Sequence, residues 1–145
     1  MAVKPIPDGF QQLIPYLVAP RVPQLIEFLK QSFGATEGRI SKRPDGVIMH
    51  AQLRIGDSAV MMAEANEQFP PLPCALYLYV QDTDAAYERA IKAGGTSLMK
   101  PCDQFYGDRN AGVKDPSGNQ WWIATHIEDV SDEELDRRAQ AQGRK

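Results

Sequence analysis

The sequence predicts an α+β fold made of two tandem βαβββ modules. A strand, an amphipathic helix and three further strands are expected in the first half of the chain, and the same order returns in the second half. Gly34 and Gly94 lie 60 residues apart, and the turn pairs Gly56-Asp57 and Gly118-Asn119 lie 62 apart. Because this period is too long for a solenoid repeat, it indicates a duplicated module. We expect residues 1–145 to form a single domain, with module one at about 11–66, module two at about 74–126 and a C-terminal helical tail at about 131–143.

Module one is expected to begin with a strand over residues 11–19 and a helix over residues 22–33. Leu13 and Leu17 alternate with other residues of the strand and share one of its sides. Gly34 follows the helix directly and suits the left-handed conformation that ends many helices. Within the helix, apolar residues recur at the spacing of a single face, as Val22, Leu25, Ile26, Leu29 and Phe33.

Three strands complete module one, over residues 37–43, 47–55 and 58–65. Pro44-Asp45-Gly46 and Gly56-Asp57 are the turns between them, because glycine and aspartate favour tight turns. The middle strand alternates between an apolar side and a polar side, and the polar side carries His50, Gln52 and Arg54.

Module two repeats this order after a proline-rich segment at residues 69–74. Asp82 is placed to cap the N-terminus of its helix, and Gly94-Gly95 to end it. Ser131 and Glu134 form a capping box that predicts the tail helix. The strands of module two are expected at 75–80, 96–101, 109–114 and 120–126, the last of them after a DPSGN turn.

Composition and charge argue against several classes of protein. The 145 residues carry a net charge of −3 and have a pI of about 5.4, which argues against electrostatic binding to nucleic acid. No apolar run is long enough to span a membrane, and the N-terminus lacks a signal region. The two cysteines, Cys74 and Cys102, are interpreted as free thiols. We therefore expect a cytoplasmic protein whose partner is a small molecule.

Three stretches carry a family resemblance. They are PYLVAPRVPQLIEFLKQSFGA from residue 15, HAQLRIGDSAVMM from residue 50 and YGDRNAGVKDPSGNQWWIATHIEDVS from residue 106. Over residues 11–130 the chain resembles the vicinal oxygen chelate superfamily, which includes glyoxalase I, extradiol dioxygenases and bleomycin-resistance proteins, and it is most similar to the PhnB-like branch. The resemblance implies two curved sheets that form a half-open cup, helices on the convex side, a ligand or a divalent metal on the concave side, and a homodimer.

The metal-ligand positions of that family can be located in this sequence. By the family's spacing they fall on Ile14, Val60, Ala75 and Trp122, none of which can bind a metal ion. We therefore expect no cofactor. A displaced site formed by His50, Glu64 and His126 remains the alternative, and it would make the protein a metal-dependent lyase, isomerase or dioxygenase.

The residues expected on the concave side combine aromatic rings with a few polar groups, as ligand pockets do. No catalytic residue is predicted, and the aromatic residues could instead fill the cup or a dimer seam. A third reading is an interaction module that uses the tail helix. Our main prediction is a metal-free small-molecule binding protein, with a ligand site formed by Tyr16, His50, Gln52, Arg54, Met62, Glu64, Tyr77, Tyr79, Trp122 and His126.

Overall fold

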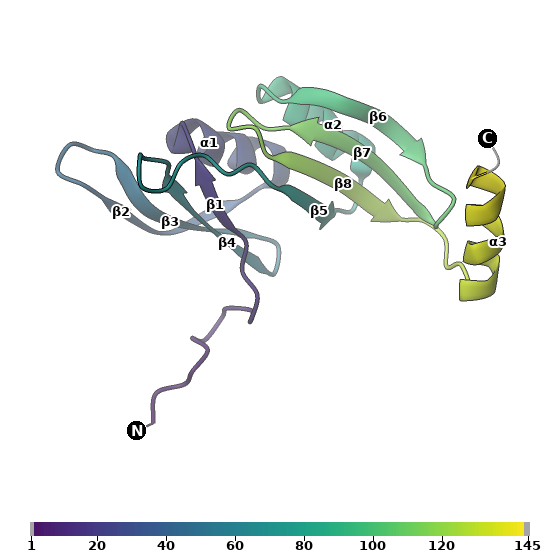
Figure 1. Cartoon of the computed structure of the whole chain (residues 1–145), viewed down its shortest axis with the longest axis horizontal. Helices are drawn as coiled ribbons and strands as arrows, with labels where there is room; N and C mark the ends of the chain where they lie inside the picture. Colours follow the sequence, from purple (N-terminus) through teal and green to yellow (C-terminus); the bar gives the residue numbers. More distant parts are fainter. Residues whose placement is uncertain (1, 144–145) are drawn as a thin grey trace.

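The computed structural model describes residues 2–143 and shows an α+β fold in which these residues form two four-stranded sheets and three helices (Figure 1). The predicted fold class is confirmed. The first βαβββ unit consists of β1 (Tyr16–Ala19), α1 (Val22–Phe33), β2 (Thr36–Lys42), β3 (Ile48–Ile55) and β4 (Ser58–Glu64). The second consists of β5 (Ala75–Tyr79), α2 (Thr83–Lys92), β6 (Thr96–Asp103), β7 (Asp108–Lys114) and β8 (Gln120–His126), and α3 (Asp132–Gly143) follows it.

The two sheets share one topology. Their strand orders are β1-β4-β3-β2 and β5-β8-β7-β6. In each sheet the first strand is parallel to the last strand of the module, and the other neighbours are antiparallel. The parallel pairing requires a crossover connection, which α1 and α2 begin. The sheets do not close into a barrel, so each keeps one face that no helix covers.

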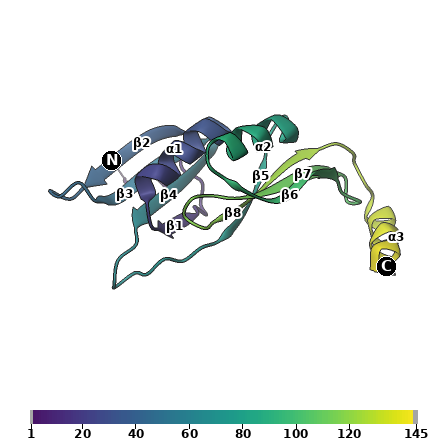
Figure 2. The same ribbon diagram turned by 90° about the horizontal axis from the view of Figure 1, so that it is seen from above.

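The helices α1 and α2 lie side by side on the same side of the two sheets (Figure 2). Between the helices and the sheets lies the core, which contains Leu25 and Phe28 of α1, Leu53 of β3, and Trp121 and Ile123 of β8. The core crosses the boundary between the modules, because the ring of Phe33 in α1 lies 5.3 Å from the ring of Trp121 in β8. We call the uncovered side of each sheet its open face.

The DPSGN turn before β8 joins the two modules. The buried Asp115 carboxylate accepts hydrogen bonds from the backbone N–H of Ser117 at 2.8 Å and from the indole N–H of Trp121 at 2.8 Å. The Ser117 hydroxyl donates to the carbonyl of Pro20 at 2.5 Å, directly before α1. The Arg21 guanidinium donates to the Pro116 carbonyl from the other direction. The turn therefore fixes the start of the first helix against the second module.

The predicted strand over 11–19 is wrong at its start, since β1 begins at Tyr16. Leu13 is 87% exposed, and Gln11 bonds the backbone of Ala59 through its side chain, so residues before Pro15 do not continue the strand ladder. No helix among residues 2–143 is long and apolar enough to cross a membrane.

Candidate functional site

The open faces follow from the strand pairings. Residues paired directly across neighbouring strands point to the same side of a sheet, so the fully buried Leu17 and Leu53 mark the helix side of the first sheet. On the first sheet the open face carries Tyr16, Val18, His50, Gln52, Arg54, Met61 and Ala63. On the second sheet it carries Tyr77, Tyr79, Asp108, Asn110, Gly112, Trp122, Ala124 and His126.

Two predicted site residues lie on the other side. Met62 pairs with Ala51 and is fully buried under α1, and Glu64 also faces the helix side. The Glu64 carboxylate accepts hydrogen bonds from the backbone N–H groups of Arg21 at 2.8 Å and of Val22 at 3.1 Å, at the start of α1. Met62 therefore lies in the core, contrary to the prediction, whereas Glu64 still reaches the rim of a cavity beside Tyr16. The consecutive pair Met61-Met62 allows either phase, and only the pairing with β3 decides it.

The polar residues predicted on the first sheet are bonded to one another or to the N-terminal segment. His50 lies 3.2 Å from the Tyr16 hydroxyl through Nδ1 and 3.2 Å from the Gln52 amide through Nε2. The Arg54 guanidinium donates to the carbonyl of Gly9 and lies 5.3 Å from the ring centre of Phe10. Arg54 thus anchors the N-terminal segment, while Tyr16 and His50 remain accessible on the open face.

A cavity of about 750 Å³ opens beside Tyr16. Its walls include three exposed apolar side chains, since Tyr16 is 50%, Met49 55% and Phe69 58% exposed. The volume falls in the usual range of small-molecule pockets. The lining is formed by Tyr16, Val18, Arg43, Val47, Ile48, Met49, Ala63, Glu64, Ala65, Asn66 and Phe69.

The loop between the modules holds Phe69 at this cavity. The backbone N–H of Asn66 donates to the Phe69 carbonyl at 2.9 Å, and the Phe69 N–H donates to the Asn66 side chain at 2.8 Å. Further along, the Leu72 N–H donates to the carbonyl of Val18 at 3.0 Å. These bonds hold the loop against β1 and place Phe69 at the cavity.

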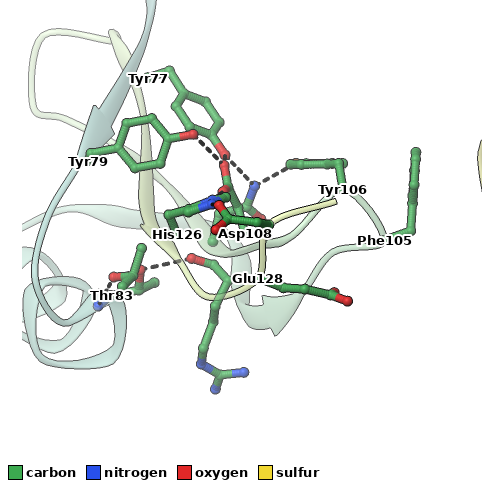
Figure 3. A network of polar contacts seen from close by, with 12 residues as sticks. Tyr77, Tyr79, Thr83, Phe105, Tyr106, Asp108, His126 and Glu128 are labelled. Atoms are coloured by element: carbon green, nitrogen blue, oxygen red, sulfur yellow. Dashed lines mark hydrogen bonds and ion pairs between the residues drawn. The ribbon is translucent and has the colours of Figure 1, made fainter. Parts of the chain in front are cut away.

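On the second sheet, polar contacts converge on Asp108 (Figure 3). Its carboxylate accepts hydrogen bonds from the hydroxyls of Tyr77 at 2.6 Å and Tyr79 at 2.8 Å, and it lies 3.0 Å from Nδ1 of His126. The other ring nitrogen of His126 lies 2.7 Å from Asp129. The side chain of Asp108 is 6% exposed, so it lies beneath the two tyrosines.

The network sets the protonation of its members. Burial alone would raise the pKa of the Asp108 carboxyl, but the hydrogen bonds from Tyr77, His126 and Tyr79 outweigh burial and lower it. The contacts with Asp129 and Asp108 raise the pKa of His126. Burial and the bond to Asp108 raise the pKa of Tyr77, so its phenol stays protonated.

The amide of Asn110 extends the network along β7. It donates to the hydroxyls of Tyr106 at 2.7 Å and Tyr77 at 3.2 Å, and it accepts from the Gln104 amide at 3.0 Å. Sequence reasoning missed Asn110 and Asp108 as site residues, although Asp108, Asn110 and Gly112 alternate with the core residues Ala111 and Val113. That alternation was the available signal.

Trp122 is placed on the open face, as predicted. The ring lies against the backbone of β7, where a Cβ atom on Gly112 would come within 2.5 Å of it. Its indole N–H donates to the Gln120 side chain at 3.3 Å. The missing side chain at Gly112 therefore lets Trp122 lie flat on the sheet and form an aromatic floor beside Tyr77, its partner across the strands.

The residues do not fit a metal site of the family type. Val60 faces the core, while Ala75 and Trp122 offer no ligand atoms for a metal. The displaced alternative is not assembled either, because His50 contacts Tyr16 and Gln52, His126 contacts Asp108 and Asp129, and Glu64 bonds the start of α1. In the described part of the chain, no three His, Cys, Asp or Glu side chains are grouped to hold a metal ion.

Comparison with known proteins gives the family. Residues 11–123 match the model of the Glyoxalase/Bleomycin resistance protein/Dioxygenase superfamily. An uncharacterised protein of Mycobacterium tuberculosis is 33% identical over 146 residues, covering 90% of this chain and 84% of that protein.

Two solved structures share the fold. TioX from Micromonospora sp. ML1 has a TM-score of 0.70 at 22% identity, covering 81% of this chain and 99% of TioX. A Bacillus cereus PhnB protein, described as a putative 3-demethylubiquinone-9 3-methyltransferase, has a TM-score of 0.63 at 16% identity, covering 79% of this chain and 99% of that one. With its paired βαβββ units and open sheet faces, the chain belongs to the Glyoxalase/Bleomycin resistance protein/Dioxygenase superfamily.

Proposed function

We propose that this protein binds an apolar, drug-sized small molecule on the open face of its first sheet, without using a metal ion. The observation that carries the proposal is the 750 Å³ cavity beside Tyr16. Its base is formed by Val18, Ile48 and Ala63, and Tyr16 and Phe69 supply aromatic walls. Burial of apolar ligand surface against these groups would provide the binding free energy.

The charged groups at the cavity favour an uncharged ligand. Both oxygens of Glu64 accept backbone hydrogen bonds at the start of α1, and Arg43 is paired with Asp45 at 2.6 Å. The acceptor oxygens of Glu64 and the guanidinium of Arg43 are therefore already engaged within the protein. A neutral, flat molecule would therefore lose the least hydration on entering the cavity.

We also propose the family branch, the oligomeric state and the cellular location that the sequence suggested. The PhnB-like branch is supported by the three sequence stretches and by the fold of the Bacillus cereus protein. A homodimer is supported by the sheets, which do not close into a barrel. A reducing, cytoplasmic location is supported by Cys74 and Cys102, which are free thiols.

Binding of Nile red, a neutral and flat dye, tests the proposed function. We expect its fluorescence to rise on binding, with an affinity that Phe69→Ala weakens about tenfold, as loss of an aromatic anchor does. Phe105→Ala, on the second module, is the matched control and should leave the affinity unchanged. Ala63→Trp should fill the cavity and abolish binding while circular dichroism stays native.

Treatment with EDTA tests whether ligand binding is independent of metal ions. The Nile red affinity should not change after exhaustive dialysis against the chelator. Loss of binding on chelation, or equal effects of Phe69→Ala and Phe105→Ala, would contradict the proposal.

A further inference from the structure

We propose that the open face of the second sheet is a separate site for primary amines, in which the phenol oxygens of Tyr77 and Tyr79 accept the N–H groups of an ammonium. The site goes beyond the cavity of the first sheet and uses different residues.

The hydrogens of Tyr77 and Tyr79 are committed inward. A carboxylate only accepts hydrogen bonds, so both phenols must donate to Asp108, at 2.6 and 2.8 Å. What each phenol then turns outward is oxygen lone pairs. Donation to a charged acceptor also makes these oxygens stronger acceptors themselves. Tyr77 already accepts from Asn110, which leaves Tyr79 as the more open acceptor.

The ring N–H groups of His126 are also engaged by carboxylates. Its two ring nitrogens lie 3.0 Å from Asp108 and 2.7 Å from Asp129, and both neighbours are carboxylates. Only an imidazolium can donate to both, so neither N–H remains for a ligand. Asp108, Asp129 and the His126 imidazolium together carry one net negative charge, which favours a cation over an anion on this face.

Tyr106 differs from the other two phenols. Its oxygen accepts from Asn110 at 2.7 Å, and among residues 2–143 its hydroxyl makes no hydrogen bond to a carboxylate. The surface that offers only acceptor oxygens is therefore confined to Tyr77 and Tyr79.

The rings supply the second half of the site. Tyr77 is 47% and Tyr79 59% exposed, and their ring centres lie 5.4 Å apart in an edge-to-face arrangement. Exposed aromatic faces attract ammonium groups through their quadrupole. Trp122, flat on Gly112 beside Tyr77, offers a surface for the apolar part of the same ligand. An arylalkyl amine matches this combination of acceptors, rings and charge.

Four probes of similar size separate the contributions. Calorimetric titration would use benzylammonium, benzyltrimethylammonium, benzyl alcohol and phenylacetate. We expect benzylammonium to bind at least tenfold more tightly than benzyl alcohol, and phenylacetate to bind most weakly. Benzyltrimethylammonium, which keeps the charge but has no N–H donor, should fall between the first two. Equal binding of benzylammonium and benzyl alcohol would overturn the proposal.

Two variants locate the site. Tyr79→Phe keeps the ring and removes the exposed acceptor, so it should weaken benzylammonium about tenfold and leave benzyl alcohol unchanged. Asp108→Asn should have the same selective effect, provided that circular dichroism shows a native fold. Tyr16→Phe, on the first sheet, is the matched control. An unchanged benzylammonium affinity in Tyr79→Phe would overturn the proposal, and retained Nile red binding would show that the first-sheet site is unaffected.

Discussion

At the scale of single residues, Asp108 has the largest influence on the second sheet. One buried carboxylate orients two exposed tyrosines and a histidine, because each of them must donate to it. Its neighbour Arg109 points to the opposite side of β7 and forms ion pairs with Asp84 at 2.8 Å and Asp103 at 3.0 Å. Asp108 and Arg109 are adjacent in the sequence, but their side chains make contacts on opposite faces of the second sheet.

The pH dependence of stability should reveal the state of His126. Because the pKa of His126 is raised above 6.5 in the folded protein, its contribution is fully present below that value and is lost as the pH rises through the folded pKa. We expect His126→Gln to lower the free energy of unfolding near pH 6, and the deficit to shrink towards pH 9. Urea unfolding at a series of pH values measures this difference.

Asp129→Asn is the companion variant for this experiment. It removes the partner that raises the pKa of His126 most, so the pH dependence should become shallower. A deficit in His126→Gln that is identical at pH 6 and pH 9 would contradict an imidazolium held between two carboxylates.

At the scale of elements, α1 shows how a strand residue can decide where a helix begins. Arg21 adopts a left-handed conformation with φ of 57° directly before the helix, and it provides no side-chain cap. Glu64, at the end of β4, supplies the missing acceptors for the first two backbone N–H groups. An acidic group at this position also interacts favourably with the helix dipole.

We expect Glu64→Ala to destabilise the protein by about 1 kcal/mol, as loss of a helix N-cap commonly does. Glu37→Ala is the control, since Glu37 is exposed and pairs only with Lys30, a contact worth less than about 0.5 kcal/mol. Urea unfolding of both variants gives the comparison. Equal stabilities would show that Glu64 does not cap α1.

At the scale of the whole molecule, the modules are joined by packing and by the DPSGN turn rather than by one continuous sheet. The Ser117 hydroxyl reaches the carbonyl of Pro20, and Arg89 of α2 reaches the carbonyl of Ser32 at the end of α1, at 3.1 Å. Both contacts link residues far apart in the chain. Together with the Phe33–Trp121 contact they make the two helices a shared layer.

Ser117→Ala should lower the free energy of unfolding by about 1 kcal/mol, because it leaves the Pro20 carbonyl without this donor. Ser58→Ala, at the exposed first residue of β4, is the control and should change stability by less than about 0.5 kcal/mol. Chemical unfolding followed by tryptophan fluorescence measures both. If the two variants are equally stable, the turn does not hold the modules together.

The sequence alone determined the repeated architecture and most of the element boundaries. Apolar residues at helical spacing placed α1 at residues 22–33, and Asp82 caps α2 through a bond to the Ala85 N–H, as expected. These features are local, because periodicity, caps and turns act over a few residues. The resemblance over residues 11–130 agrees with the superfamily that the comparisons show.

Only the tertiary structure decided which side chains meet. The phase of β4 depends on its pairing with β3, so Met62 lies in the core and the Glu64 carboxylate bonds the backbone at the start of α1. The gathering of Tyr77, Asp108 and His126 depends on strands that are distant in the chain, and the place of Phe69 depends on a loop crossing beside β1. Long-range pairing sets these contacts, and in β4 the consecutive apolar residues Met61 and Met62 left the inward-facing side undecided until the strand was paired.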